Sequence, residues 1–138
     1  VETIQRNGKF LLQIINDILD LSKIDSGKFE IEQIAISPSE ILNEIRSLLD
    51  VRAAEKQIAF QVHLDGSIPN TIQTDPIRLR QILVNLVGNA IKFTDRGRVD
   101  LYCRYDRSRN AMVFRIIDTG IGIDAEVLPN LFQPFVQA

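Results

Sequence analysis

Two asparagines and a lysine occur at helical spacing in the apolar segment Leu83–Thr94. Asn85, Asn89 and Lys92 are separated by four and three residues, so a helix places all three on one side. Asn is a poor helix former, and a buried amide without a partner costs about 1–3 kcal/mol. Amide oxygens suit Mg²⁺, and an ammonium group suits phosphate. The pattern predicts a site for a magnesium-bound phosphate, unless the amides simply face solvent or form a structural network.

Gly88 lies within the same stripe and costs about 1 kcal/mol relative to alanine in a helix. We expect it to leave bare backbone where a ligand could approach.

A second motif, Asp118–Asp124, follows a predicted strand and contains two glycines that allow backbone to lie close to a flat ligand or a phosphate. The carboxylate of Asp118 could accept a hydrogen bond from an exocyclic amine such as that of adenine. The alternative is an ordinary Asx-turn. The glycines and Ala125 also match the dinucleotide fingerprint G-x-G-x-x-A, but Pro129 interrupts the long helix that a Rossmann unit needs.

The elements that must position these motifs alternate between helix and strand. Ser37-Pro38-Ser39-Glu40 is a capping box, and Asp75-Pro76 is a second helix start. The expected helices cover residues 38–54 and 75–94, and the expected strands cover residues 29–36, 58–64, 71–74, 98–105 and 111–117. This order predicts an α+β fold, a two-layer sandwich with helices on one face of a mixed sheet.

The N-terminal residues, up to about Asp25, form a further predicted helix with a heptad pattern. Its apolar positions are Ile4, Leu11 and Ile18, together with Ile14, Leu21, Leu12, Ile15, Leu19 and Ile24. This surface is wide enough for a helical bundle, so it must pack on another chain, on an absent segment or on the rest of the domain. Ser26-Gly27-Lys28 ends the helix and predicts a boundary between residues 1–26 and 27–138.

The composition is that of an ordinary globular protein. The chain has 138 residues, 45% of them hydrophobic and 25% charged, with a formal net charge of −2. Basic residues are interleaved with acidic ones, which argues against nucleic-acid binding, and neither a membrane span nor a signal peptide is expected. Cys103 is the only cysteine, so no internal disulfide can form and a reducing compartment is expected. Its alternation with apolar neighbours predicts a core position.

Three motifs occur in a specific order: the asparagine-bearing helix, the Asp-Thr-Gly-Ile-Gly turn and the segment Leu131–Gln137. Together they resemble the N, G1 and F motifs of the catalytic ATP-binding domain of sensor histidine kinases. Residues 11–24 are similar to the second helix of that family's dimerisation and phosphoacceptor bundle. The resemblance covers nearly the whole chain. The particular residues of these motifs are similar to those of the hybrid kinases.

The resemblance implies an ATP and Mg²⁺ site. Asn89 would coordinate Mg²⁺ with Asn85 in support, Lys92 would contact the phosphates, and Asp118 would bind adenine. The other implied pocket residues are Phe93, Gly120, Gly122 and Ile123, with Phe132 and Phe135 anchoring a lid. The last two could instead be ordinary apolar packing residues.

The chain departs from the family pattern in two ways. It lacks the phosphoacceptor histidine of the first bundle helix, since its one histidine, His63, is expected on the solvent face of a strand. It also stops just after the F motif, so the ATP-binding fold is expected to be incomplete at the C-terminus, and this fragment alone should not autophosphorylate.

The resemblance implies that the full-length protein is a homodimer, joined through the N-terminal helix, that passes phosphate to a response-regulator receiver domain. It also implies that this segment is cytoplasmic, either in a cytoplasmic kinase or as the cytoplasmic part of a membrane-bound sensor. This segment itself would make no contact with a membrane. Two alternatives remain at this point. One is a dimerising scaffold that binds no nucleotide, and the other is a different ATPase with the same nucleotide fold.

Overall fold

The computed structural model describes residues 1–134 and contains three α-helices and five strands within that range. The elements are α1 (Glu2–Asp25), β1 (Ile34–Ile36), α2 (Pro38–Glu55), β2 (Ala59–Leu64), β3 (Ile72–Thr74), α3 (Pro76–Lys92), β4 (Arg98–Asp106) and β5 (Ala111–Asp118), followed by a short 3₁₀ turn at Leu128–Asn130. Two compact units are present, Val1–Glu32 and a larger unit that begins at Gln33.

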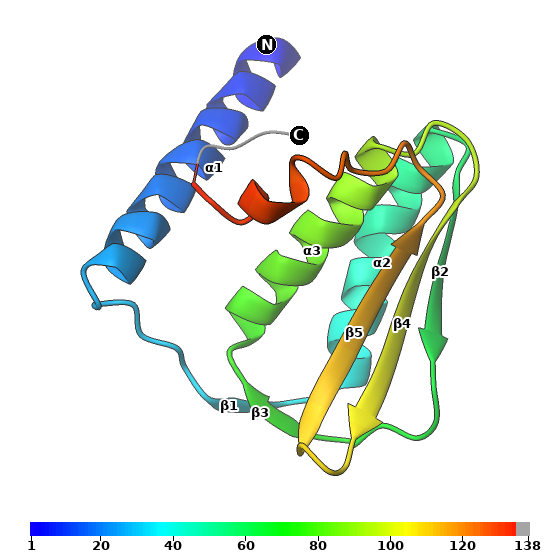
Figure 1. The fold of residues 1–138 in the computed structure, drawn as a ribbon. Helices are drawn as coiled ribbons and strands as arrows, with labels where there is room; N and C mark the ends of the chain where they lie inside the picture. The colour runs from blue at the N-terminus through cyan, green and yellow to red at the C-terminus, as the bar shows by residue number, and fades with distance from the viewer. Residues whose placement is uncertain (135–138) are drawn as a thin grey trace. The chain divides into compact units, whose positions relative to one another are not determined.

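The main sheet of the larger unit has three strands in the order β2-β4-β5. β2 runs parallel to β4, and β4 runs antiparallel to β5, so the sheet is mixed. Helices α2 and α3 cover one of its faces (Figure 1). The predicted two-layer α+β arrangement is therefore confirmed.

The core lies between these helices and the sheet. α2 contributes Ile45 and Leu49, α3 contributes Leu83 and Val87, and all four are at most 1% exposed. Alternate residues of β4 point into this core, as the sequence pattern predicts, and they are Val99, Leu101 and Cys103. Burial raises the pKa of the Cys103 thiol to about 11.

Both predicted helix starts are confirmed. The Ser37 side chain accepts a hydrogen bond from the Glu40 N–H at 3.4 Å, and Asp75 Oδ1 accepts from the Ile77 and Arg78 N–H groups at 3.1 and 3.0 Å. These bonds satisfy amides that have no partner within the helix.

The first strand is shorter than predicted. Only Ile34–Ile36 is a strand, whereas the apolar pattern extends back to Phe29. β1 pairs with β3 in a separate antiparallel pair, and β3 has just three residues. The ladder ends at Ile34 because its partner Thr74 is the last residue of β3, and helix α3 begins at Pro76.

Helix α1 is confirmed, and none of its residues is buried. The side chains of its large apolar residues from Ile4 to Ile24 are between 39% and 77% exposed, with the exception of Leu21. Across residues 1–134, no helix combines the length and the apolar character that a membrane span requires.

Candidate functional site

The predicted polar stripe lies on the outer side of α3. Asn85, Asn89 and Lys92 are all exposed, whereas the side chains on the opposite face of the helix are buried. The helix therefore presents both amides and the ammonium group together, as their spacing predicts. Exposed amides are expected both if they simply face solvent and if they form a ligand site. The residues that adjoin the stripe must therefore decide between these two interpretations.

The C-terminal end of α3 is hydrogen-bonded to the turn that follows β5. The Ile121 N–H donates to the Phe93 carbonyl oxygen at 3.2 Å. A Cβ at Gly120 would lie 2.5 Å from that same oxygen and 2.8 Å from Thr94 Oγ1, so only glycine fits there. We call this contact of residues 93–94 with residues 120–121 the junction. It lies where α3 and β5 end side by side (Figure 1).

Asp118 is fixed by the turn that it begins. Its Oδ1 accepts a hydrogen bond from the Gly120 N–H at 2.9 Å, so the Asx-turn that the sequence left open is present. The next residue, Thr119, bonds the backbone of Arg98 at the start of β4, with N···O distances of 3.2 and 3.0 Å. An ionised carboxylate has about four acceptor positions, so one internal bond leaves capacity for a ligand amine.

The other predicted pocket residues continue along the chain from this turn. Gly122 has a φ of +75°, a left-handed conformation that favours glycine, and the Ile123 side chain is 47% exposed. Phe132 is 93% exposed, so it is not packed into a core within residues 1–134. Phe135 lies outside the described residues.

Gly88 is half-buried, and its bare backbone lies beside a side chain of the neighbouring helix. A Cβ at this position would lie 3.7 Å from the Arg52 guanidinium, which belongs to α2. Gly88 is three residues from Asn85 and four from Lys92, so it borders the polar stripe, with Arg52 beside it.

The donor chemistry at the end of α3 fits Mg²⁺ carried by a phosphate chain. Within residues 1–134, no group of three or more His, Cys, Asp or Glu side chains could hold a metal ion. Mg²⁺ commonly takes one or two protein oxygens and completes its shell with phosphates and water. The amides of Asn85 and Asn89 could supply such oxygens. Lys92 Nζ lies 5.1 Å from the centre of the Phe93 ring, at the same end of the helix.

Two residues whose side chains bond the last carbonyl groups of α3 were missed by the sequence analysis. Thr94 is fully buried, and its hydroxyl donates to the Ala90 carbonyl at 2.8 Å. Lys56 Nζ donates to the Ile91 and Lys92 carbonyls at 2.9 and 2.8 Å. Thr94 adjoins the motif in sequence and could have been found there. Lys56 could not, because 35 residues separate it from Ile91.

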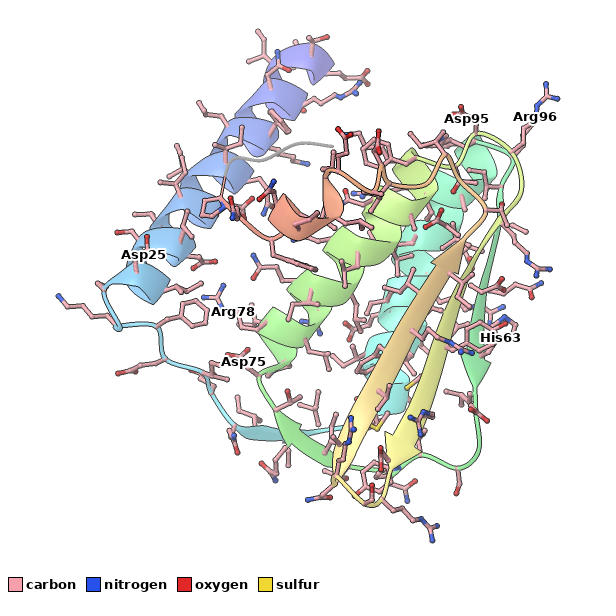
Figure 2. All side chains as sticks on the ribbon, viewed as in Figure 1. Asp25, His63, Asp75, Arg78, Asp95 and Arg96 are labelled. Carbon is pink, nitrogen blue, oxygen red and sulfur yellow. The ribbon has the colours of Figure 1, made fainter. Side chains whose placement is uncertain are left out.

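His63 lies on the face of the sheet away from the helices, as predicted (Figure 2). It is less open to solvent than expected, because its side chain is 37% exposed and its Nε2 lies 2.8 Å from Oδ1 of Asp100. Its ring also stacks on Tyr102 with ring centres 4.5 Å apart. Asp100 is only 5% exposed, and no sequence pattern indicated this buried carboxylate.

Comparison with known proteins places this geometry in a family. Residues 74–138 match the family described as "Histidine kinase-, DNA gyrase B-, and HSP90-like ATPase". The whole chain also aligns with the signal transduction histidine-protein kinase BarA of Escherichia coli K12, with 40% identity over 141 residues. The chain carries the ATP-binding domain of the sensor histidine kinase family.

Further relatives agree with this assignment to the sensor histidine kinases. The autoinducer 2 sensor kinase/phosphatase LuxQ of Vibrio vulnificus is 37% identical over 142 residues, covering 100% of this chain. The structure of full-length ShkA in complex with AMPPNP superposes with a TM-score of 0.86 and 31% identity, over 99% of this chain and 29% of ShkA. The chain spans 17% of LuxQ and 15% of BarA. The resemblance drawn from the sequence is thus confirmed.

Proposed function

We propose that this sensor histidine kinase segment positions Mg²⁺-ATP for transfer of the γ-phosphoryl group to a histidine, and onward to a response-regulator aspartate. The junction is the observation that carries the proposal. It holds the end of the polar stripe against the turn that begins at Asp118, through the 3.2 Å bond between Ile121 and Phe93. One site can then engage both the phosphates and the base of a nucleotide.

The roles that we assign follow from the chemistry of each group. Asn89 and Asn85 offer amide oxygens to Mg²⁺, and Lys92 offers a positive charge to the phosphates. Asp118 accepts a hydrogen bond from the adenine amine. The remaining assignments are a pocket wall formed by Phe93, Gly120, Gly122 and Ile123, and lid anchors at Phe132 and Phe135.

Bound Mg²⁺ would neutralise charge on the phosphates during transfer, which consists mostly of positioning and electrostatic stabilisation. The chain's own residues hold the nucleotide in place. The acceptor histidine must lie outside these 138 residues, because His63 is the single histidine and is bonded to a buried carboxylate on the sheet face away from α3.

We also propose that residues 1–26 form the second helix of a dimerisation bundle and that residues 27–138 form the ATP-binding domain. The uncovered apolar surface of α1 supports this division. A receiver domain would be the partner in phosphotransfer, and the kinase would act in the cytoplasm. The solved complex of ThkA with the response regulator protein TrrA superposes with a TM-score of 0.73 at 23% identity, which supports the fold alone.

Isothermal calorimetry with ATP, ADP and GTP tests the proposal. We expect Asp118→Asn to weaken ATP binding by about tenfold or more, because a hydrogen bond to a charged group is lost. The preference for ATP over GTP should also be smaller in Asp118→Asn than in the parent chain, since guanine has a carbonyl where adenine has an amine.

Asp65→Asn is the matched control, because Asp65 is exposed in a loop after β2. Its ATP affinity should equal that of the parent chain. Removing Mg²⁺ with a chelator should weaken binding of ATP, and Asn89→Ala should reduce that dependence on Mg²⁺. Equal ATP affinity in the parent and in Asp118→Asn would remove the role assigned to Asp118. A parent chain that binds no nucleotide would favour the scaffold alternative.

A further inference from the structure

The last carbonyl groups of α3 are bonded by residues from three other parts of the larger unit. A helix leaves its final carbonyls without partners inside the helix. Here the Thr94 hydroxyl bonds the Ala90 carbonyl, and the Ile121 N–H bonds the Phe93 carbonyl. The two carbonyls between them, those of Ile91 and Lys92, both accept from Lys56 Nζ.

Lys56 occupies a fixed position at the end of α2. The Ile58 N–H donates to the Ala53 carbonyl at 2.9 Å, and the Gln57 N–H donates to Ala54 at 3.0 Å. Gln57 has a φ of +57°, so this pattern is a Schellman ending with a left-handed residue. The backbone that carries Lys56 is thereby held by two hydrogen bonds and by the buried residues Ala53 and Ile58.

The ammonium group of Lys56 suits its location. A cation is favoured at a helix C-terminus, where the carbonyl ends of the peptide dipoles accumulate. The bonds to Ile91 and Lys92 are 2.9 and 2.8 Å long, within the range of charge-assisted hydrogen bonds. Asp95 Oδ1 lies 3.9 Å away, but its side chain is 87% exposed, so that ion pair is the weaker contact.

We propose that Lys56 is a positioning residue for the nucleotide site. It fixes the last turn of α3, which carries Asn89, Lys92 and Phe93, and so sets the geometry of the junction on which the bond to Ile121 depends. This inference rests on the proposed function, because the site it positions is the one assigned to Mg²⁺-ATP. It differs from a general stabilising role, since the effect should be confined to the junction and to nucleotide binding.

Lys56→Met tests the proposal, because it retains an unbranched apolar side chain and removes the donor. Hydrogen exchange reports directly on the amides of Phe93, Thr94 and Ile121. We expect these amides to exchange about tenfold faster or more in Lys56→Met, because a charge-assisted bond is lost. Amides of β4 should be unchanged.

Nucleotide affinity is the second measurement, made on the kinase at its native length. Lys56→Met should raise the Kd for Mg²⁺-ATP by about tenfold, and Lys56→Arg should restore most of the affinity because it retains a charged donor. The matched control is Arg46→Met, on the same helix, where the exposed cation pairs with the half-exposed Asp50 at 3.6 Å. It should change neither measurement.

The two readouts separate this proposal from the one on which it rests. If the parent binds no nucleotide, the proposed function fails, and hydrogen exchange alone decides whether Lys56 holds the junction. If the parent binds and Lys56→Met binds equally well, the positioning role is wrong. If amides in every helix and strand exchange faster in Lys56→Met, Lys56 is a merely structural residue. That result would also overturn the positioning role. Should Lys56→Met not fold, Lys56→Gln, which keeps a neutral donor, serves in both measurements.

Discussion

At the scale of single residues, the two possible roles of Asp118 do not exclude one another. The Asx-turn uses Oδ1 as acceptor for the Gly120 N–H, and this bond fixes the direction of the carboxylate. An acceptor already held in position loses less freedom when it meets a ligand. The structural interpretation and the nucleotide-binding interpretation thus describe one arrangement.

Cys103 gives a prediction that depends on its burial. The thiol is fully buried, and burial raises its pKa from an ordinary value of 9.0 to about 11. The unfolded chain therefore ionises first as the pH rises. The stabilisation is fully present below about pH 9 and is lost as the pH approaches 11.

Urea unfolding of the parent and of Cys103→Ala between pH 8 and pH 10 measures this effect. We expect the free energy of unfolding to fall more steeply with pH in the parent, by up to about 1.4 kcal/mol per pH unit. Tyrosines and lysines titrate in both proteins, so the difference isolates the thiol. Parallel pH profiles would contradict the assignment. The folded parent should also react slowly with a thiol reagent at pH 8.

At the scale of elements, the close approach of α3 to the turn after β5 depends on one glycine. We expect Gly120→Ala to push the turn away from Phe93, because the new methyl group would lie 2.5 Å from a backbone oxygen that cannot rotate aside. The cost should be about 1–3 kcal/mol of stability, typical of an overpacked contact. Nucleotide affinity should fall with it.

Gly88→Ala is the matched control in the helix itself. Its methyl group would meet only the Arg52 guanidinium, at an ordinary 3.7 Å. Alanine in a helix interior should then raise stability by up to about 1 kcal/mol and leave affinity unchanged. Urea unfolding and calorimetry on both variants check the pair. Equal effects at the two positions would show that the junction has no special steric demand.

At the scale of the whole molecule, the smaller unit, Val1–Glu32, exposes the apolar side chains of α1, and none of the residues of this helix is buried. Full burial of one Leu or Ile side chain contributes about 1.5–3 kcal/mol. We expect the chain to associate through α1, because its heptad positions place several such side chains on one side. Sedimentation equilibrium of the chain and of a variant without residues 1–32 measures this.

A pair of substitutions tests the same surface without deletion. Ile14→Glu lies on the heptad pattern and should weaken association, whereas Ser22→Glu changes a polar position and should not. Circular dichroism checks that each variant retains its helices. A chain that remains monomeric with α1 intact would rule out dimerisation by this helix.

Local chemistry allowed much of the fold and part of the site to be predicted from the sequence. Apolar periodicity defined α1, α2, α3 and the main strands, since each pattern arises within one element. Ser37 and Asp75 defined two helix starts, because a cap bonds amides only two or three residues away. The spacing of Asn85 and Asn89 likewise placed them on one face of a helix.

The tertiary structure alone decided which of these parts touch. β1 is short because its partner β3 is short, and the Arg52 side chain of α2 reaches Gly88 because of how the two helices pack. The bonds from Ile121 to Phe93 and from Lys56 to Ile91 join residues far apart in the chain. No local pattern encodes such pairs, because they form only when the core has brought the ends of α2, α3 and β5 to one place.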